Sequence, residues 1–138
     1  MTETFVRVNY SEVDQMGVVY HARYLVWLDV ARCEHLRRQG MSYADLERRG
    51  LRLAVSELRI RYRNAARYDD AVRIRCWVRE SVPRRVSFGY ALNLAGSDTQ
   101  VATAEVSLLA LNADFALARL PADVLALLPS EPDPVRLF

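Results

Sequence analysis

The sequence contains no lysine. All nineteen of its basic residues are arginine, and with seventeen acidic residues they leave a formal net charge of only +2. Because these charges are spread along the chain, and nucleic-acid-binding domains need a one-sided basic patch, we expect no nucleic-acid partner. The absence of lysine by itself carries little functional information, although guanidinium groups suit phosphate and carboxylate partners.

Long apolar segments and targeting signals are missing too. No apolar run approaches the roughly 20 residues that span a bilayer, and the segment from Met1 to Val8 lacks the basic start and apolar core of a signal peptide. We therefore expect no membrane partner and a cytoplasmic location. Only two cysteines occur, Cys33 and Cys76, without a Cys-x-x-Cys pair or clustered histidines, so we expect buried free thiols and no metal site.

Glycine-rich phosphate-binding loops and dinucleotide fingerprints are also absent, so a nucleotide cofactor of the redox or kinase type is not expected. The composition that remains is that of an average globular protein, 51% hydrophobic and 26% charged over 138 residues. A chain of this length buries about two thirds of its unfolded surface. We expect one domain over residues 1–138, with an irregular tail from about residue 129, where prolines recur.

The first half of the sequence predicts a strand, a loop and two helices. Apolar and polar residues alternate over Phe5–Tyr10, which is typical of a strand. Turn-forming residues and acids follow over Ser11–Gly17. From about His21 to Arg38 the chain has no helix breaker, and Gly40 is placed to end this helix. A shorter helix is expected over Ser42–Arg49, capped by the serine.

Polarity is distributed unevenly along the long helix. Its first half is apolar on nearly all sides, so we expect the helix to be enclosed rather than laid on a surface. Its end is polar, and His35 in that part is expected to be exposed to solvent. His35 is therefore not a functional candidate.

The second half of the sequence predicts four strands. They are expected at residues 57–63, 72–79, 85–94 and 100–112, with a last helical turn near 121–128. Alternation gives the first two strands one apolar and one polar face, and it places Trp77 on the polar face. Short turns join the four strands, so we expect an antiparallel meander that curls around the long helix. The predicted fold class is α+β.

Asp14 is the most informative single position. It lies in the loop, seven residues before the expected helix start at His21, and Gly17 between them permits a tight bend. Taken alone, an aspartate before a glycine is most often a turn or capping residue. The residues around Asp14 change that interpretation.

The segment from Tyr10 to Leu25 resembles the signature of the 4-hydroxybenzoyl-CoA thioesterase family of hotdog proteins, especially its Tol-Pal-associated acyl-CoA thioesterase branch. That signature reads Asp-x-x-Gly-Val-Val-Tyr-His, then a small residue, any residue and Tyr. The residues that match it are Asp14, Gly17, Val18, Val19, Tyr20, His21 and Tyr24. A weaker resemblance covers residues 5 to 120. Glu12 and Val13 depart from the branch, which often has Asp and usually has Thr there, and this bears on substrate preference.

The resemblance implies a hotdog fold, in which an antiparallel five-stranded sheet wraps around one long central helix, and hydrolysis of an acyl-CoA thioester. It implies that Asp14 attacks the thioester carbonyl, or directs water onto it, as a nucleophile or general base. The backbone N–H of His21 would receive the developing oxyanion, because a helix start offers unpaired N–H groups and partial positive charge. No cofactor is implied besides coenzyme A as part of the substrate.

Residues near the motif and at one distant turn are further candidates. The His21 side chain is a second catalytic candidate, with a helix-cap or surface histidine as an equal alternative. Family members place a basic residue and a serine at the third hairpin, where they would contact CoA phosphates, although hairpin tips are often charged only to stay hydrated. Tyr24 also suits core packing. The candidates for substrate binding are Gly17, Tyr20, Tyr24, Arg85 and Ser87.

Other functions stay open on the same scaffold. A hydratase or dehydratase of acyl thioesters would need a histidine and an acid across the cleft, and an acyl-CoA-binding module would need no catalytic group. The resemblance also implies a homo-oligomer, at least a dimer and commonly a dimer of dimers, and the edges of a five-stranded sheet invite such pairing. The sequence leaves open the acyl group, and whether its carrier is CoA or an acyl-carrier protein.

Overall fold

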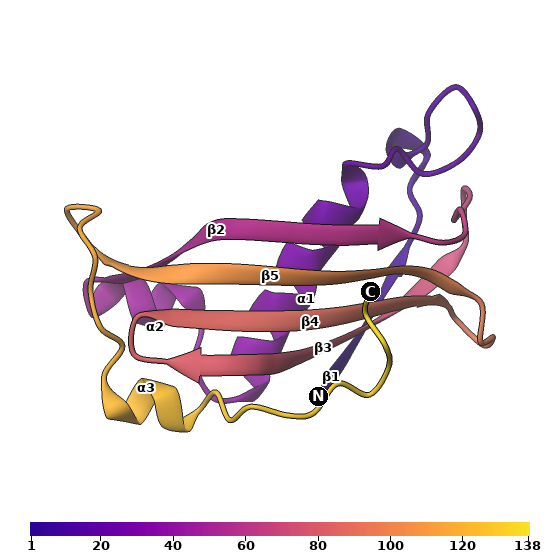
Figure 1. Cartoon of the computed structure of the whole chain (residues 1–138). Coiled ribbons are helices and arrows are strands. Elements are labelled where there is room, and N and C mark those ends of the chain that lie inside the picture. The colour runs from indigo at the N-terminus through magenta and orange to yellow at the C-terminus, as the bar shows by residue number, and fades with distance from the viewer.

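The computed structural model describes residues 1–138 and consists of one antiparallel sheet, one long helix and three short ones (Figure 1). The order of one strand, one long helix and four strands is the expected one, and the α+β class is confirmed. None of the helices is both long and apolar enough to cross a membrane. In chain order the elements are β1 (Thr2–Arg7), the 3-10 helix η1 (Tyr10–Glu12), α1 (Arg23–Arg38), α2 (Tyr43–Arg48), β2 (Leu51–Tyr62), β3 (Ala71–Val82), β4 (Arg85–Leu94), β5 (Gln100–Asn112) and α3 (Ala122–Ala126).

The strands lie in the order β1-β3-β4-β5-β2, and every neighbouring pair is antiparallel. β3, β4 and β5 form the expected hairpins, but the predicted four-strand meander is wrong at β2. This strand pairs with β5, from Leu51 opposite Asn112 to Tyr62 opposite Ala102. The link over residues 63–70 carries the chain across the end of the curved sheet to β3. Turn residues predict that a chain reverses, and they do not specify which strand it then joins.

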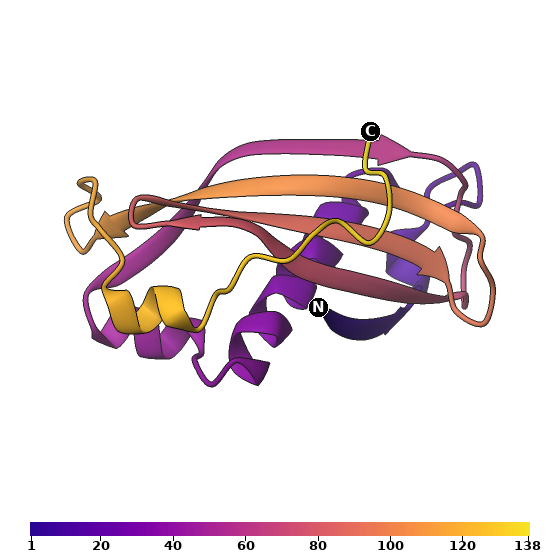
Figure 2. The same ribbon diagram turned by 60° about the horizontal axis from the view of Figure 1, so that its bottom comes forward.

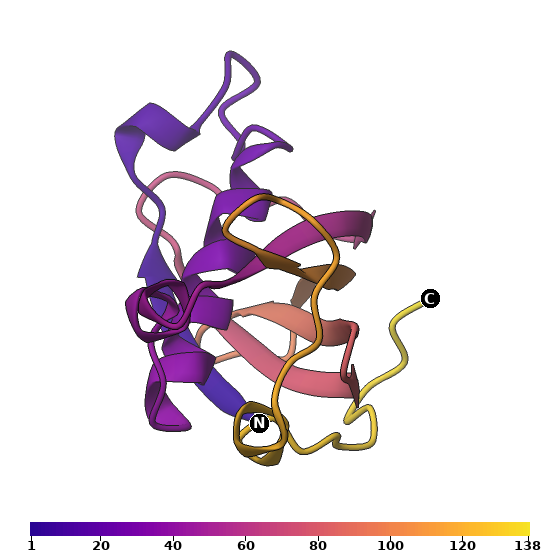
Figure 3. The ribbon, with the colours of Figure 1, turned by 90° about the vertical axis from the view of Figure 1, so that its left-hand side faces the viewer.

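α1 lies against the concave face of the sheet, and its buried side chains belong to the same core as the inner faces of β3, β4 and β5 (Figure 3). Trp27, Leu28 and Ala31 on this helix are all at most 3% exposed. The helix is not enclosed on every side, as its composition suggested, because Val26 and Val30 remain 50% and 42% exposed. The sheet therefore covers one face of α1 and leaves the opposite face open within a single chain.

His35 is buried, which corrects the prediction that it faces solvent. It lies one helical turn after Ala31 and two turns after Leu28, so it falls on the core-facing side of α1. Its Nδ1 lies 2.8 Å from the Thr2 hydroxyl of β1, and its ring packs edge-on against Phe88 of β4. Burial is the main cause that lowers the pKa of His35 below its ordinary value.

The tail over residues 129–138 is irregular and runs across the outer face of the sheet (Figure 2; Figure 3 shows α1 and the tail on opposite sides). It covers Trp77, which is fully buried in a small cluster with Leu137 and was predicted to face solvent. The Trp77 indole N–H donates to Asp133 at 2.9 Å. Alternation within β3 could not predict this burial, because the covering residues are more than fifty positions away.

Candidate active site

The loop between η1 and α1 is held in place by Glu12. Its carboxylate accepts hydrogen bonds from the backbone N–H of Asn9 at 2.8 Å and from the indole N–H of Trp27 at 2.7 Å. Its backbone carbonyl accepts from the N–H of Tyr20 at 2.8 Å. This η1 turn also explains why β1 ends at Arg7, before the predicted end of the strand. Glu12, a departure from the family signature, therefore ties both ends of the loop to the core helix.

Asp14 sits in a tight turn within this loop. Val13 and Val19 form an isolated antiparallel bridge, and the Asp14 N–H donates to the Val18 carbonyl at 2.9 Å. Gly17 has φ 77°, a left-handed conformation that favours glycine, so it makes the predicted bend possible. One carboxylate oxygen of Asp14 accepts from the Met16 N–H at 2.8 Å. The aspartate is half-buried, and its second oxygen has no hydrogen-bond partner in the chain.

Asp14 lines a pocket of about 260 Å³ beside the amino end of α1. The far wall is the link after β2, which is joined to the loop by a hydrogen bond from the Val19 N–H to the Ala66 carbonyl and to α1 by one from the Ala66 N–H to the Tyr24 hydroxyl. No group of three or more His, Cys, Asp or Glu side chains could hold a metal ion. The residues that line the pocket are Asp14, Met16, Val18, Val19, His21, Tyr24, Tyr62, Arg63, Asn64 and Ala65.

The turn before α1 supplies free backbone donors. α1 begins at Arg23, two residues later than predicted, so His21 and Ala22 precede the helix. Within the chain, the N–H groups of both residues lack a hydrogen-bond acceptor. Ala22 occupies the N-cap position and offers no side-chain cap. An uncapped helix start keeps its N–H groups available for an anion, and the helix dipole adds partial positive charge there.

The aromatic candidates of the motif differ in where they lie. Tyr24 is 3% exposed, so it packs in the core, and it also lines the pocket. Burial raises the pKa of Tyr24, which keeps its hydroxyl protonated. The Tyr20 side chain is 47% exposed and is not among the pocket residues, although its ring packs edge-on against the exposed His21 ring at 4.6 Å. Tyr20 thus borders the pocket only through His21.

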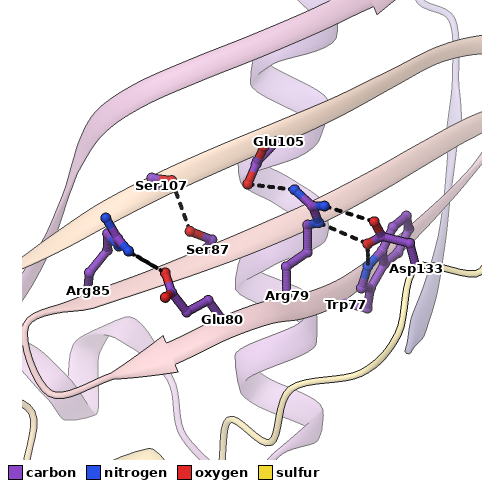
Figure 4. Close-up of polar contacts among 8 residues, drawn as sticks. All are labelled: Trp77, Arg79, Glu80, Arg85, Ser87, Glu105, Ser107 and Asp133. Atoms are coloured by element: carbon purple, nitrogen blue, oxygen red, sulfur yellow. Dashed lines mark hydrogen bonds and ion pairs between the residues drawn. The ribbon is translucent and has the colours of Figure 1, made fainter. Parts of the chain in front are cut away.

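Arg85 and Ser87 lie away from this pocket. Both are near the start of β4, where Arg85 pairs with Leu109 of β5. The pocket residue Tyr62 pairs with Ala102, at the other end of β5, so the start of β4 lies at the end of the sheet opposite the Asp14 loop. The Arg85 guanidinium donates to the Glu80 carboxylate, at a shortest distance of 2.6 Å, and the Ser87 hydroxyl lies 2.9 Å from that of Ser107. Figure 4 shows both contacts. Ser87 also lines a polar hollow of about 370 Å³ on the outer face. One chain therefore does not bring these two candidates to Asp14.

Four pocket residues that lie outside the motif were missed by the sequence analysis, namely Tyr62, Arg63, Asn64 and Ala65. They stand at the end of β2 and the start of the following link. A tyrosine at a strand end before a polar turn was the available signal, but its proximity to Asp14 depends on the pairing of β2 with β5, which the sequence did not predict.

The chain is similar in sequence to known proteins. Residues 8–128 match the family described as the thioesterase-like superfamily. YneP of Bacillus subtilis is 35% identical over 92 residues, which are 66% of this chain and 67% of YneP. The acyl-CoA thioesterase YbgC of Haemophilus influenzae is 42% identical over 76 residues, which are 54% of this chain and 56% of YbgC.

Solved structures extend the similarity to nearly the whole chain. The hypothetical protein TT1821 from Thermus thermophilus superposes with a TM-score of 0.88 at 34% identity and covers 93% of this chain and 97% of its own. 4-Hydroxybenzoyl CoA thioesterase superposes with a TM-score of 0.85 over 93% of this chain and 98% of its own, and at 19% identity this shows the fold alone. The chain therefore belongs to the thioesterase-like superfamily and has the hotdog fold.

Proposed function

We propose that this chain hydrolyses acyl-CoA thioesters to the carboxylic acid and CoA, with Asp14 as the catalytic carboxylate. The observation that carries the proposal is that Asp14 shares one pocket with His21, whose backbone N–H is free to receive an oxyanion. The similarity to the acyl-CoA thioesterase YbgC supports the same reaction class. Tyr24 then lines the pocket for the acyl group, Gly17 permits the bend that holds Asp14 in place, and Tyr20 packs against His21 from outside the pocket.

Two routes through this site are chemically balanced. Asp14 can attack the carbonyl carbon itself, which forms a mixed anhydride and releases CoA thiolate, and water then hydrolyses the anhydride. Alternatively, Asp14 accepts a proton from water while the water oxygen attacks, and collapse of the tetrahedral intermediate breaks the C–S bond. In both routes the carbonyl oxygen becomes negative and needs a donor, which we assign to the His21 N–H. One such donor is worth about 3 to 4 kcal/mol of the barrier.

Arg85 and Ser87 can bind the substrate held at Asp14 only if they come from a second copy of the chain. β2 is an edge strand, and its Val55, Leu58 and Tyr62 side chains are 53%, 40% and 45% exposed. Antiparallel pairing of two β2 edges would continue the sheet and place the Arg85 end of one chain beside the Asp14 end of the other. We therefore infer a homodimer at minimum, with a dimer of dimers as the larger assembly. Light scattering on the purified protein tests this inference, and a monodisperse monomer would overturn it.

The activity test is hydrolysis of an acyl-CoA panel with acetyl, decanoyl and benzoyl groups, followed by detection of free CoA. Asp14→Asn keeps an oxygen that can accept from the Met16 N–H, so the turn should persist while kcat falls about 10²- to 10⁴-fold. Asp98→Asn, in the exposed turn between β4 and β5 and outside the pocket lining, is the matched control. Full activity in Asp14→Asn would refute the assignment, and water addition to an enoyl-CoA without CoA release would favour a hydratase.

A further inference from the structure

Tyr62 makes the one side-chain hydrogen bond to the turn that precedes α1. Its hydroxyl donates to the backbone carbonyl of His21 at 2.8 Å. Its ring lies 5.6 Å from the ring of Tyr24 and 6.4 Å, edge-on, from that of His21. The turn is otherwise held by three backbone hydrogen bonds, from the Tyr20 N–H to the Glu12 carbonyl, from the Arg23 N–H to the Tyr20 carbonyl and from the Leu25 N–H to the Ala22 carbonyl.

The acceptor of this bond is chemically coupled to a free donor. The His21 carbonyl and the Ala22 N–H belong to one planar peptide unit, so fixing the carbonyl also fixes the direction of the N–H. A hydrogen bond received at the oxygen polarises the peptide and strengthens the N–H as a donor. The Ala22 N–H lacks an acceptor within the chain, and Ala22 provides no cap that could orient it locally. Tyr62 therefore controls a donor that the local sequence leaves unconstrained.

Tyr62 reaches this turn from a firmly held position. It is the last residue of β2 and pairs with Ala102 of β5, while its side chain forms part of the pocket wall. Burial raises the pKa of Tyr62, so the hydroxyl stays protonated and able to donate in the neutral range. The bond thus links the site to a strand residue 41 positions after His21, outside the motif that supplies Asp14.

We propose that Tyr62 is a positioning residue for thioester hydrolysis, in which its hydroxyl aligns and polarises the His21–Ala22 peptide so that the Ala22 N–H is a second oxyanion donor. This rests on the function proposed above. As the carbon–oxygen π electrons move onto the thioester oxygen, the Ala22 N–H donates to that oxygen without losing its proton. Collapse of the intermediate restores the carbonyl and releases CoA thiolate. Throughout, the Tyr62 proton stays on its own oxygen.

The test compares Tyr62→Phe with the wild type on the best substrate of the acyl-CoA panel. The variant keeps the ring and its packing, so we expect an unchanged melting temperature and oligomeric state, an unchanged KM and a kcat lower by about three- to tenfold. Tyr68→Phe is the matched control, because Tyr68 is 54% exposed, lies outside the pocket and should leave kcat unchanged. A kcat within a factor of two of the wild type would overturn the proposal.

A second measurement separates positioning from a general structural role. A trifluoromethyl ketone analogue of the same acyl-CoA presents an oxyanion as its adduct, whereas a thioether analogue presents none. We expect Tyr62→Phe to bind the ketone more weakly, by the same factor by which kcat falls, and to bind the thioether with unchanged affinity. The reason is that only interactions made in the transition state are affected. Equal weakening of both analogues, or of neither, would overturn the proposal.

The two proposals fail in distinguishable ways. If the native chain releases no CoA from any panel member, or if Asp14→Asn retains full activity, the catalytic function itself is wrong. If Asp14→Asn is inactive while Tyr62→Phe matches the wild type in kcat and in ketone affinity, only the role of Tyr62 is wrong.

Discussion

The outer face of the sheet allows a sharp test of packing at Gly89. This residue lies opposite Trp77 in the β3–β4 pair, and a Cβ added there would stand 2.5 Å from Cε2 of the Trp77 ring. Ordinary carbon–carbon contacts are about 3.5 to 4.0 Å, so Gly89→Ala requires the ring to move by about 1 Å or more. Trp77 is fully buried beneath Leu137, and it therefore cannot move without displacing the tail.

The size of the effect follows from these contacts. Overpacking a filled site costs about 1 to 3 kcal/mol, and loss of the Trp77 hydrogen bond to Asp133 adds about 1 kcal/mol. Reduced backbone freedom in the unfolded chain offsets about 0.4 to 1 kcal/mol. We expect Gly89→Ala to lower the free energy of unfolding by about 2 to 3 kcal/mol, which corresponds to a melting temperature roughly 8 to 12 °C lower.

A double-mutant cycle identifies the clash as the cause. In a Trp77→Leu background the ring is gone, so Gly89→Ala should cost less than about 0.5 kcal/mol and can even stabilise the chain. Thermal and urea unfolding of all four proteins, at one fixed protein concentration, gives the coupling energy between the two sites. The same loss in both backgrounds would show that the predicted collision between Gly89 and Trp77 does not determine stability.

The remaining predictions concern the buried titratable groups. Burial lowers the pKa of His35, the N-terminal ammonium and Arg38 lower it further, and Glu131 opposes them. The stability that neutral His35 provides is therefore complete above its ordinary pKa of about 6.5 and is lost as pH falls below that value. Urea midpoints should therefore drop from pH 7.5 to pH 5.5 in the wild type, and by a smaller amount in His35→Gln; equal drops would contradict the assignment. Burial raises the pKa of Cys76 to about 12, so a thiol reagent at pH 8 should modify at most Cys33 in the native chain and both thiols after denaturation; two reactive thiols in the native chain would show that Cys76 is accessible.

Local patterns predicted the helices and strands well, but they predicted less well which segments each element pairs with or is buried by. β4 and β5 have the predicted bounds, and Ser42 caps α2 as expected, because alternation and capping are properties of neighbouring residues. The errors at Trp77 and His35 share another cause. Each is buried by a segment remote in sequence, the tail in one case and the first strand in the other. Periodicity within one element does not contain that information.

The same distinction between local patterns and long-range contacts applies to the candidate site. Asp14, His21 and Tyr24 were predicted from one contiguous motif, and they meet in one pocket because loop and helix follow each other directly. Tyr62 was missed because it enters the pocket through a strand pairing formed with residues 100–112. Arg85 and Ser87 were selected by resemblance, and within one chain they lie at the other end of the sheet.

The pairing of β2 with β5 also sets the order in which the site can assemble during synthesis. Every residue lining the pocket lies between positions 14 and 65, yet the wall formed by Tyr62 and Asn64 has no neighbouring strand until residues 100–102 at the start of β5 have been made. Contacts between such distant segments form slowly because a long loop must close first. A nascent or truncated chain that carries the whole motif should therefore lack the pocket, and its hydrolytic chemistry would begin only when the final strand is in place.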